Sequence, residues 1–360
     1  MTDEQIAKKK KYAGEKKTSM KRRDDHHDYT ERRMYMITIE VEGRRPVFGK
    51  LVGNPFAPDG RGQEPRIELS ELGNAVQSEW MGIHGYYPQI EVMGVQMMPD
   101  HMHGILFVKS PLPVHLGQVI SGFKAGCRKA EKALKATAKP MPTEKTMAKA
   151  SPQAAVSPQA KASPQATAPP YAQSTPYRPI FAKGYNDLIL RSYEELPAWL
   201  NYLHDNPRRL MMKRARPDLL RPFFNLQIGS QTYNGIGNRQ LLSAPRRIAV
   251  RLSRRLTETD IEKEVFNHLE AARQGAVLVS PAISPAEKRV MRAVFDAGYP
   301  TIVLMENGFT PLSKPYGEQF YACAKGTLLM LSPWEHHNEK RKLTATQCQQ
   351  LNLMALEISK

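Results

Sequence analysis

The chain has 360 residues, a length typical of two domains rather than one. Lys and Arg total 52 against 35 Asp and Glu, a formal net charge of +17, which favours a polyanionic partner such as nucleic acid. Hydrophobic residues make up 41%, enough for an ordinary core, and no apolar run reaches the roughly 18–20 residues of a membrane span. Three widely spaced cysteines without a CxxC pair argue against a disulfide framework or zinc ribbon and favour a reducing cytoplasm.

The first half begins with residues 1–33, which are basic and have no apolar period, so we expect a disordered arm. The β-forming run Met34–Val41 predicts a strand. A helix is expected from about Glu71, with Ser70 as its N-cap. Two further strands, Ile90–Met98 and His101–Val108, are predicted to form a hairpin around Pro99 and Asp100.

Leu116–Leu134 has the pattern of an amphipathic helix. Its polar face carries Lys124, Arg128, Lys129 and Lys132, which we predict to contact DNA phosphates. A solvated basic face with no ligand is the alternative. After this helix, residues 136–178 repeat SPQA three times and predict an extended insert. We therefore expect one domain over residues 34–224, interrupted by this insert, and a second over residues 225–360.

The second domain contains short continuous apolar runs at Gly275–Pro281, Thr301–Asn307 and Thr327–Pro333, separated by helical segments. This pattern predicts a parallel sheet covered on both faces, hence an α/β fold. Ser284 to Glu287 reads as a capping box. The glycines of Gly235–Arg239 make only a weak phosphate-loop pattern. Candidate loops for a nucleotide or DNA ligand are Ser280–Ser284, where the helix N-terminus could accept an anion, and Asn307–Lys314.

His101 and His103 are one residue apart on a predicted strand, so alternation places both imidazoles on one face. Two adjacent imidazoles can bind one divalent ion, and two exposed strand histidines are the alternative.

After the insert, Ser192 to Glu195 predicts a helix start, and Pro207 predicts its end near Asn206. Tyr202 and Asn206 are four residues apart on this helix, hence on one face. An amphipathic tyrosine and a plain C-cap asparagine are the alternatives.

These motifs in this order resemble the REP-associated tyrosine transposases, within the single-tyrosine HUH transposase superfamily. MPDHMHGI, ending at Ile105, is similar to the family's MPNHxHG signature, and YLHDNP from Tyr202 to its YIxxNP helix. The resemblance covers residues 34–206 apart from the insert. It implies an α+β ferredoxin-like domain with an antiparallel sheet. The later strands and helices weakly resemble the Rossmann-like domain of SMF-type DNA-processing proteins.

Carried over residue by residue, the resemblance implies that His101 and His103 bind Mg²⁺ or Mn²⁺ and that Tyr202 is the nucleophile. Asn206 would be the third metal ligand, with Asp205 and His204 as local substitutes, because the broader superfamily has glutamine there. The implied reaction cleaves and rejoins single-stranded DNA through a 5′-phosphotyrosine intermediate. The implied partners are hairpin-forming repeats and a second copy of the chain, as a homodimer.

Three alternatives stay open. Tyr185, before a β-like run, is the rival nucleophile. The chain could be a catalytically silent DNA-binding regulator that retains the transposase fold, although a pure binder needs no such combination of histidines and tyrosine. A plasmid-type relaxase or replication initiator would use the same chemistry, but these commonly carry a helicase, and no GxxxxGK[ST] motif occurs here.

Overall fold

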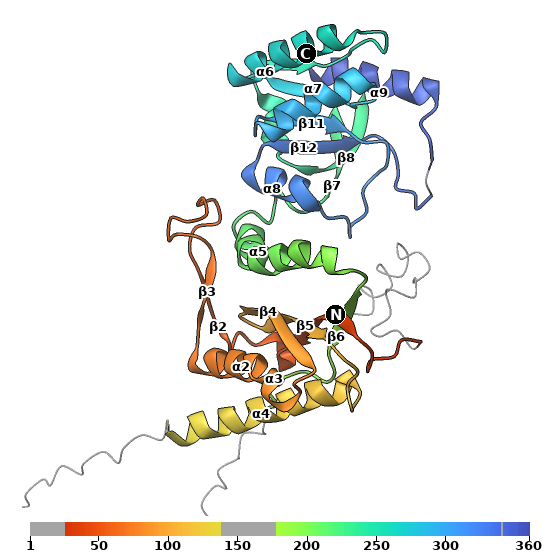
Figure 1. The fold of residues 1–360 in the computed structure, drawn as a ribbon. Helices are drawn as coiled ribbons and strands as arrows, with labels where there is room; N and C mark the ends of the chain where they lie inside the picture. The colour runs from red at the N-terminus through yellow and green to blue at the C-terminus, as the bar shows by residue number, and fades with distance from the viewer. Residues whose placement is uncertain (1–25, 138–177, 340) are drawn as a thin grey trace, which may run out of the picture. The chain divides into compact units, whose positions relative to one another are not determined.

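The computed structural model describes residues 26–137, 178–339 and 341–360 (Figure 1). They form two compact units. The N-terminal unit comprises residues 26–51 and 67–204, and the C-terminal unit comprises Val52–Arg66 and Asp205–Lys360. Of the predicted insert, residues 136–178, positions 138–177 lie outside the described residues, and residues 136 and 137 belong to the helix before it. No described helix is both long enough and apolar enough to cross a membrane.

The N-terminal unit is built on a four-stranded antiparallel sheet in the order β4-β5-β1-β6. In chain order its elements alternate as βαββαβ, the ferredoxin-like arrangement that was expected (Figure 1). They are β1 (Arg33–Glu40), α2 (Glu71–Met81), α3 (Ile83–Tyr86), β4 (Ile90–Met98), β5 (His101–Val108), α4 (Leu116–Thr137) and β6 (Asn186–Leu190). The predicted hairpin of β4 and β5 is confirmed, and Ser70 caps α2 by accepting from the Gly73 amide at 3.0 Å.

The two faces of this sheet bury different clusters. On one face, side chains such as Ile37 and Met102 pack against α2 and α4 through Trp80 and Phe123. On the other face, Ile105 and its neighbours pack against Leu196 and Leu203. Because side chains alternate along a strand, the residues next to Met102 must lie on this second face. That face therefore carries His101 and His103, as their spacing predicts.

The predicted basic arm ends earlier than expected. It was placed at residues 1–33, but Tyr29 is buried in the core and its hydroxyl donates to Asp187 at 2.8 Å. His27 is also partly buried, and its Nε2 atom lies 2.9 Å from the Tyr35 hydroxyl. The arm was predicted from the charged residues around Tyr29. That prediction did not take account of the apolar ring of Tyr29, which is buried in the core. After β1, β2 (Gly49–Val52) and β3 (Arg66–Leu69) pair in a two-stranded sheet.

The helix that carries Tyr202 differs from its prediction at both ends. A 3₁₀ turn, η3 (Tyr193–Glu195), precedes α5 (Leu196–Ala215), and Ser192 makes no side-chain cap bond. Pro207 does not end the helix, which continues for eight more residues, through Ala215. Proline removes one intrahelical hydrogen bond, and packing of the following turns offsets that loss: Met212 is buried in the C-terminal unit.

The C-terminal unit contains a six-stranded sheet in the order β7-β8-β12-β11-β10-β9. The last four of these strands are parallel, as predicted, and β7 and β8 add an antiparallel edge. The strands are β7 (Phe223–Ile228), β8 (Gln231–Gly237), β9 (Arg247–Ala249), β10 (Val277–Ser280), β11 (Thr301–Leu304) and β12 (Leu328–Ser332). A short 3₁₀ helix, η4 (Arg239–Ser243), follows β8.

Helices cover both faces of this sheet. The crossover helices are α6 (Glu258–Arg273), α7 (Pro285–Asp296) and α8 (Gly317–Lys325). They pack on the face that presents Leu278 and Met330, whereas α9 (Ala345–Ile358) packs on the face that presents Val279 and Leu331. Because the parallel strands follow one another in chain order, right-handed crossovers place all three helices on one side. The predicted capping box at Ser284 is confirmed.

One prediction tests the packing beneath the histidine strand. A Cβ at Gly104 would lie 2.2 Å from the Cζ2 atom of the fully buried Trp80. We expect Gly104→Ala to lower the free energy of unfolding by about 1–3 kcal/mol, the usual cost of overpacking, in urea denaturation. The matched control is Gly122→Ala on α4, where a Cβ would meet no atom within 4 Å. It should be neutral or stabilising, and equal effects would contradict the argument.

Candidate active site

Two imidazoles lie side by side on β5, with ring centroids 4.9 Å apart at an interplanar angle of 90°. The Nδ1 atom of His103 lies 2.8 Å from the Thr38 hydroxyl, which stands opposite it on β1. The Nδ1 atom of His101 lies 2.7 Å from the Asp100 carboxylate. These contacts leave Nε2 of both rings as the atoms available to a ligand. A hydrogen bond to the ring nitrogen that does not bind the metal is the usual way in which a protein orients a metal-binding histidine.

The electrostatics of the site keep His103 neutral. Its burial, together with the charges of His101 and Arg44, lowers the pKa of His103 to about 4. A neutral ring retains the lone pair that a metal ion requires. Arg44 is held by Glu40 at 3.1 Å and lies 3.6 Å from Asp100. Its backbone is left-handed, with φ of 55°, directly after Gly43.

Tyr202 lies on α5 above the same face of the sheet. Its ring centroid is 6.3 Å from that of His103 and 5.7 Å from that of Trp199. The side chain is 41% exposed, although the adjacent Leu203 is buried against the sheet. The apolar residues Leu196 and Leu203 thus pack α5 against the sheet, and the Tyr202 phenol remains exposed to solvent beside the imidazole pair. The structure brings together three of the predicted site residues: His101, His103 and Tyr202.

The rival Tyr185 has a different environment. It is 4% exposed and belongs to the cluster on the opposite face of the sheet, with α2 and α4. The sheet therefore separates the Tyr185 phenol from the two histidines, whereas the Tyr202 ring lies on their side of the sheet.

The third ligand is less completely defined. Asn206 lies one helical turn after Tyr202 on α5, and its Nδ2 atom is buried with no hydrogen-bond partner among the described residues. Its amide is thus not held by another contact. Of the two substitutes, Asp205 accepts a hydrogen bond from the Tyr321 hydroxyl, and His204 is exposed. Within residues 26–137, 178–339 and 341–360, no three His, Cys, Asp or Glu side chains group so as to hold a metal ion.

The donor set fits a divalent cation in part. Two neutral imidazoles supply adjacent nitrogen ligands, and the remaining positions would be filled by oxygen from Asn206, water or a phosphate. Sequence reasoning missed Thr38 and Arg44. Alternation along β1 could have indicated a polar Thr38 on one face, but only the strand register places it opposite His103.

The predicted DNA-binding helix lies on the other face of the sheet. Arg128, Lys129 and Lys132 are exposed along α4. In contrast, the Lys124 ammonium donates to the carbonyls of Ala182 and Gly184, at 2.9 and 2.5 Å. The sheet therefore separates this basic surface from the imidazole pair, and Lys124 is engaged in holding the segment before β6.

At the predicted anion site of α7, side chains of the chain itself cap the helix N-terminus. The Glu287 carboxylate itself accepts from the amides of Ile283 and Ser284, both at 2.9 Å, and of Leu252 at 3.1 Å. An internal anion thus occupies the helix N-terminus. Gly235 and Gly237 form no phosphate loop either, because both lie in β8, where a Cβ would meet β12 carbonyl oxygens at 2.4 and 2.2 Å.

Glu287 gives a second stability prediction. Glutamine keeps the shape of this side chain but has only one acceptor oxygen. In the structure, the three backbone amides donate to both oxygens of the Glu287 carboxylate. We expect Glu287→Gln to lower the free energy of unfolding by about 1–3 kcal/mol, measured by urea denaturation. Glu262→Gln on the exposed face of α6 removes the same charge and should have little effect. An unchanged midpoint in Glu287→Gln would show that its amide contacts contribute nothing.

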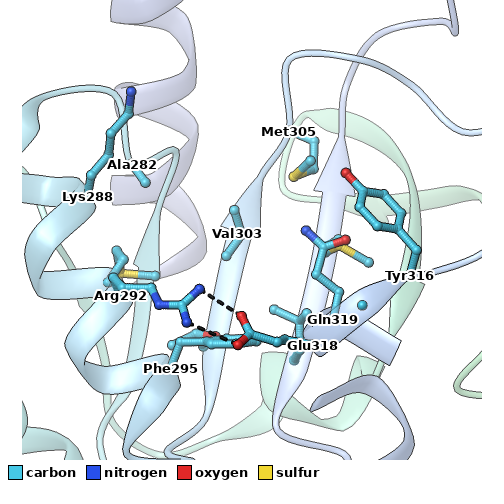
Figure 2. A pocket seen from close by; sticks show the side chains of 14 residues that line it. Ala282, Lys288, Arg292, Phe295, Val303, Met305, Tyr316, Glu318 and Gln319 are labelled. Carbon is cyan, nitrogen blue, oxygen red and sulfur yellow. Dashed lines mark hydrogen bonds and ion pairs between the residues drawn. The ribbon is translucent and has the colours of Figure 1, made fainter. Parts of the chain in front are cut away.

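A pocket of about 510 Å³ does exist in this unit, between α7 and α8 (Figure 2). Its lining includes Val303 from β11 and Met330 from β12, and Arg292 of α7 bonds with Glu318 of α8 at 2.8 and 3.2 Å. This volume suits a small ligand. A nucleotide or DNA ligand for this domain stays a prediction.

Comparisons with known proteins give distant likenesses. No family model matches the chain. An uncharacterised protein of Haemophilus influenzae is 26% identical over 121 residues, a match that spans 28% of this chain and 61% of that protein. The chain also resembles three solved structures at low TM-score. DNA processing protein A from Helicobacter pylori, described as binding single-stranded DNA, has 17% identity and a TM-score of 0.30 over 39% of this chain and 66% of that one.

The second solved structure is a REP-associated tyrosine transposase bound to a REP hairpin. It has 10% identity and a TM-score of 0.28, over 51% of this chain and 70% of that one. The third is DNA processing protein A from Streptococcus pneumoniae, with 16% identity and a TM-score of 0.29 over 47% of this chain and 60% of that one. The matches thus cover less than two thirds of the length of the Haemophilus influenzae protein and of both DNA processing proteins.

Proposed function

We propose that this protein is a DNA transposase that cleaves and rejoins single-stranded DNA through Tyr202, with a divalent metal at His101 and His103. The observation that carries the proposal is the placement of an exposed phenol 6.3 Å, between ring centroids, from an oriented pair of imidazoles. The MPDHMHGI and YLHDNP motifs support the same reading. Asn206 is proposed as the third ligand, and hairpin-forming repeats and a second copy of the chain as partners.

The proposed chemistry is a transesterification. The Tyr202 oxygen attacks phosphorus, a bond forms between them, and the bond from phosphorus to the 3′ oxygen breaks. The phenolic proton ends on that 3′ oxygen, which leaves a free 3′-hydroxyl and a 5′-phosphotyrosine link. A bound Mg²⁺ or Mn²⁺ would polarise the phosphate and offset its developing charge. The phosphotyrosine link conserves the energy of the broken phosphodiester bond. The 3′-hydroxyl of another strand can therefore attack this link and rejoin the DNA without ATP.

The chain's own residues prepare this step. Thr38 and Asp100 contact the two rings through Nδ1, which leaves Nε2 of each ring free to bind the proposed metal ion. Leu203, buried against the sheet, holds α5 in place beside the histidines. Preorganisation of this kind removes the need to order the groups during the reaction.

The test is a denaturing-gel assay for a covalent protein–DNA adduct. Single-stranded hairpin oligonucleotides from the flanks of the gene are incubated with full-length protein and Mg²⁺, Mn²⁺ or EDTA. An adduct that forms with metal and not with EDTA supports the proposal. An adduct that forms equally in EDTA contradicts the metal role.

A silent DNA-binding regulator is the second candidate, favoured by the exposed cations of α4 and the net charge of +17. It predicts tight, salt-sensitive binding of the same oligonucleotides with no adduct under any metal condition.

A further inference from the structure

A cluster of cations surrounds two aromatic side chains in the C-terminal unit. The guanidinium of Arg209, on α5, lies 4.1 Å from the centroid of the Phe320 ring and donates to the Tyr321 hydroxyl at 3.2 Å. The ammonium of Lys213, one turn further, lies 5.8 Å from the same Phe320 ring. Lys314, on the loop before α8, is close enough for its charge to act on Lys213. We call Arg209, Lys213 and Lys314 the α5 cation cluster.

No ion pair with a carboxylate is formed by these three cations within the described part of the chain. Asp205, the acidic group beside them, is bonded to the Tyr321 hydroxyl. Burial, Arg209 and Lys314 all lower the pKa of Lys213. Other arginines of the unit differ: Arg208 pairs with Asp59, and Arg292 with Asp296. Asp205 partly compensates the charge of Arg209, whereas Lys213 and Lys314 form no ion pair with a carboxylate in the described part of the chain. Two like charges held close together are unfavourable unless an external anion compensates them.

We propose that the α5 cation cluster binds phosphodiesters of single-stranded DNA, a site distinct from both the imidazole pair and the basic face of α4. The choice of DNA as the polyanion rests on the proposed function; the anion-binding character rests on the cluster itself. A guanidinium held over an aromatic ring, as Arg209 is over Phe320, is suited to contacts with an unpaired base and its phosphate. The largely exposed Tyr316, two residues after Lys314, adds an aromatic face nearby.

The test measures noncovalent binding in EDTA, so that it does not depend on cleavage. Full-length protein and the double variant Lys213→Gln, Lys314→Gln are titrated with a dT20 oligonucleotide at several salt concentrations. Each lost phosphate contact should reduce the slope of log K against log salt by about 0.7, hence about 1.4 for the pair. Affinity at about 0.1 M salt should fall roughly tenfold. Both lysines lie at exposed positions of the chain.

The matched control is Lys263→Gln, Lys325→Gln, which removes the same charge from exposed positions on α6 and α8. An unchanged slope in the control and a reduced slope in the cluster variant support the site. Equal slopes in the two double variants overturn it, because net charge alone would then explain binding. Inorganic phosphate that displaces dT20 at low millimolar concentration would show a site for a free anion and would also overturn it. An absent covalent adduct in the cleavage assay would leave this readout intact, so the two proposals fail separately.

Discussion

Replacement of Tyr202 by phenylalanine is expected to abolish the covalent protein–DNA adduct completely. Phenylalanine keeps the ring that packs against Trp199 and lies beside His103, but it lacks the oxygen that would attack phosphorus. Folding and noncovalent DNA binding should therefore be preserved. The measurement is the denaturing-gel assay with metal, accompanied by dT20 binding in EDTA to show that the variant still recognises DNA.

Two other tyrosines serve as controls for this experiment. Tyr185→Phe changes a buried phenol on the far face of the sheet, and its adduct should match that of the unmodified protein. Tyr193→Phe removes an exposed hydroxyl on the turn before α5, where the side chain is 61% exposed, and should also be silent. An adduct that survives in Tyr202→Phe and disappears in Tyr185→Phe would mean that the nucleophile is placed on the wrong segment.

Loss of His103 should have the second largest effect. In His103→Ala, one of two imidazole ligands is missing and a buried polar site is left beside Thr38. Metal assistance is worth several kcal/mol in such reactions, so we expect the initial rate of adduct formation to fall by about 10²-fold or more. Direct titration with Mn²⁺ should show the same loss, since the binding measurement does not require cleavage.

Supporting variants separate a ligand role from a structural one. Thr38→Val removes the hydroxyl that contacts Nδ1 of His103. We expect it to lower the rate of adduct formation about 10–100-fold, the usual effect of losing a contact that orients a metal-binding histidine. Thr38→Ser keeps a hydroxyl and should restore the rate. His84→Ala, at an exposed position on α3, is the neutral control. Unchanged Mn²⁺ binding and cleavage in His103→Ala would remove the histidine pair from the mechanism.

The cations of α4 and the imidazole pair are both proposed to contact DNA. The cations of α4 and the imidazole pair lie on opposite faces of the antiparallel sheet. One strand at the histidines therefore cannot also lie flat along α4 of the same copy without passing the sheet edge.

Local patterns predicted most of the secondary structure. Runs of β-forming residues predicted β1, β4 and β5, and apolar continuity predicted β10, β11 and β12. Cap residues located the starts of α2 and α7. These signals succeed because strand and helix periods are properties of neighbouring residues. The pattern failed at Pro207, where the burial of Met212 outweighed a local signal for a helix end.

The sequence by itself determined which reactive groups this protein contains and where they lie along the chain. It specified two imidazoles on one face of a strand, a phenol and an amide one helical turn apart, and a large excess of positive charge. Only the tertiary structure decided which groups meet. It placed Thr38 opposite His103, left Tyr202 exposed while burying Tyr185, and used Glu287 to fill the anion position at α7. Strand register and burial depend on contacts between residues far apart in the chain, and a local pattern contains no information about those contacts.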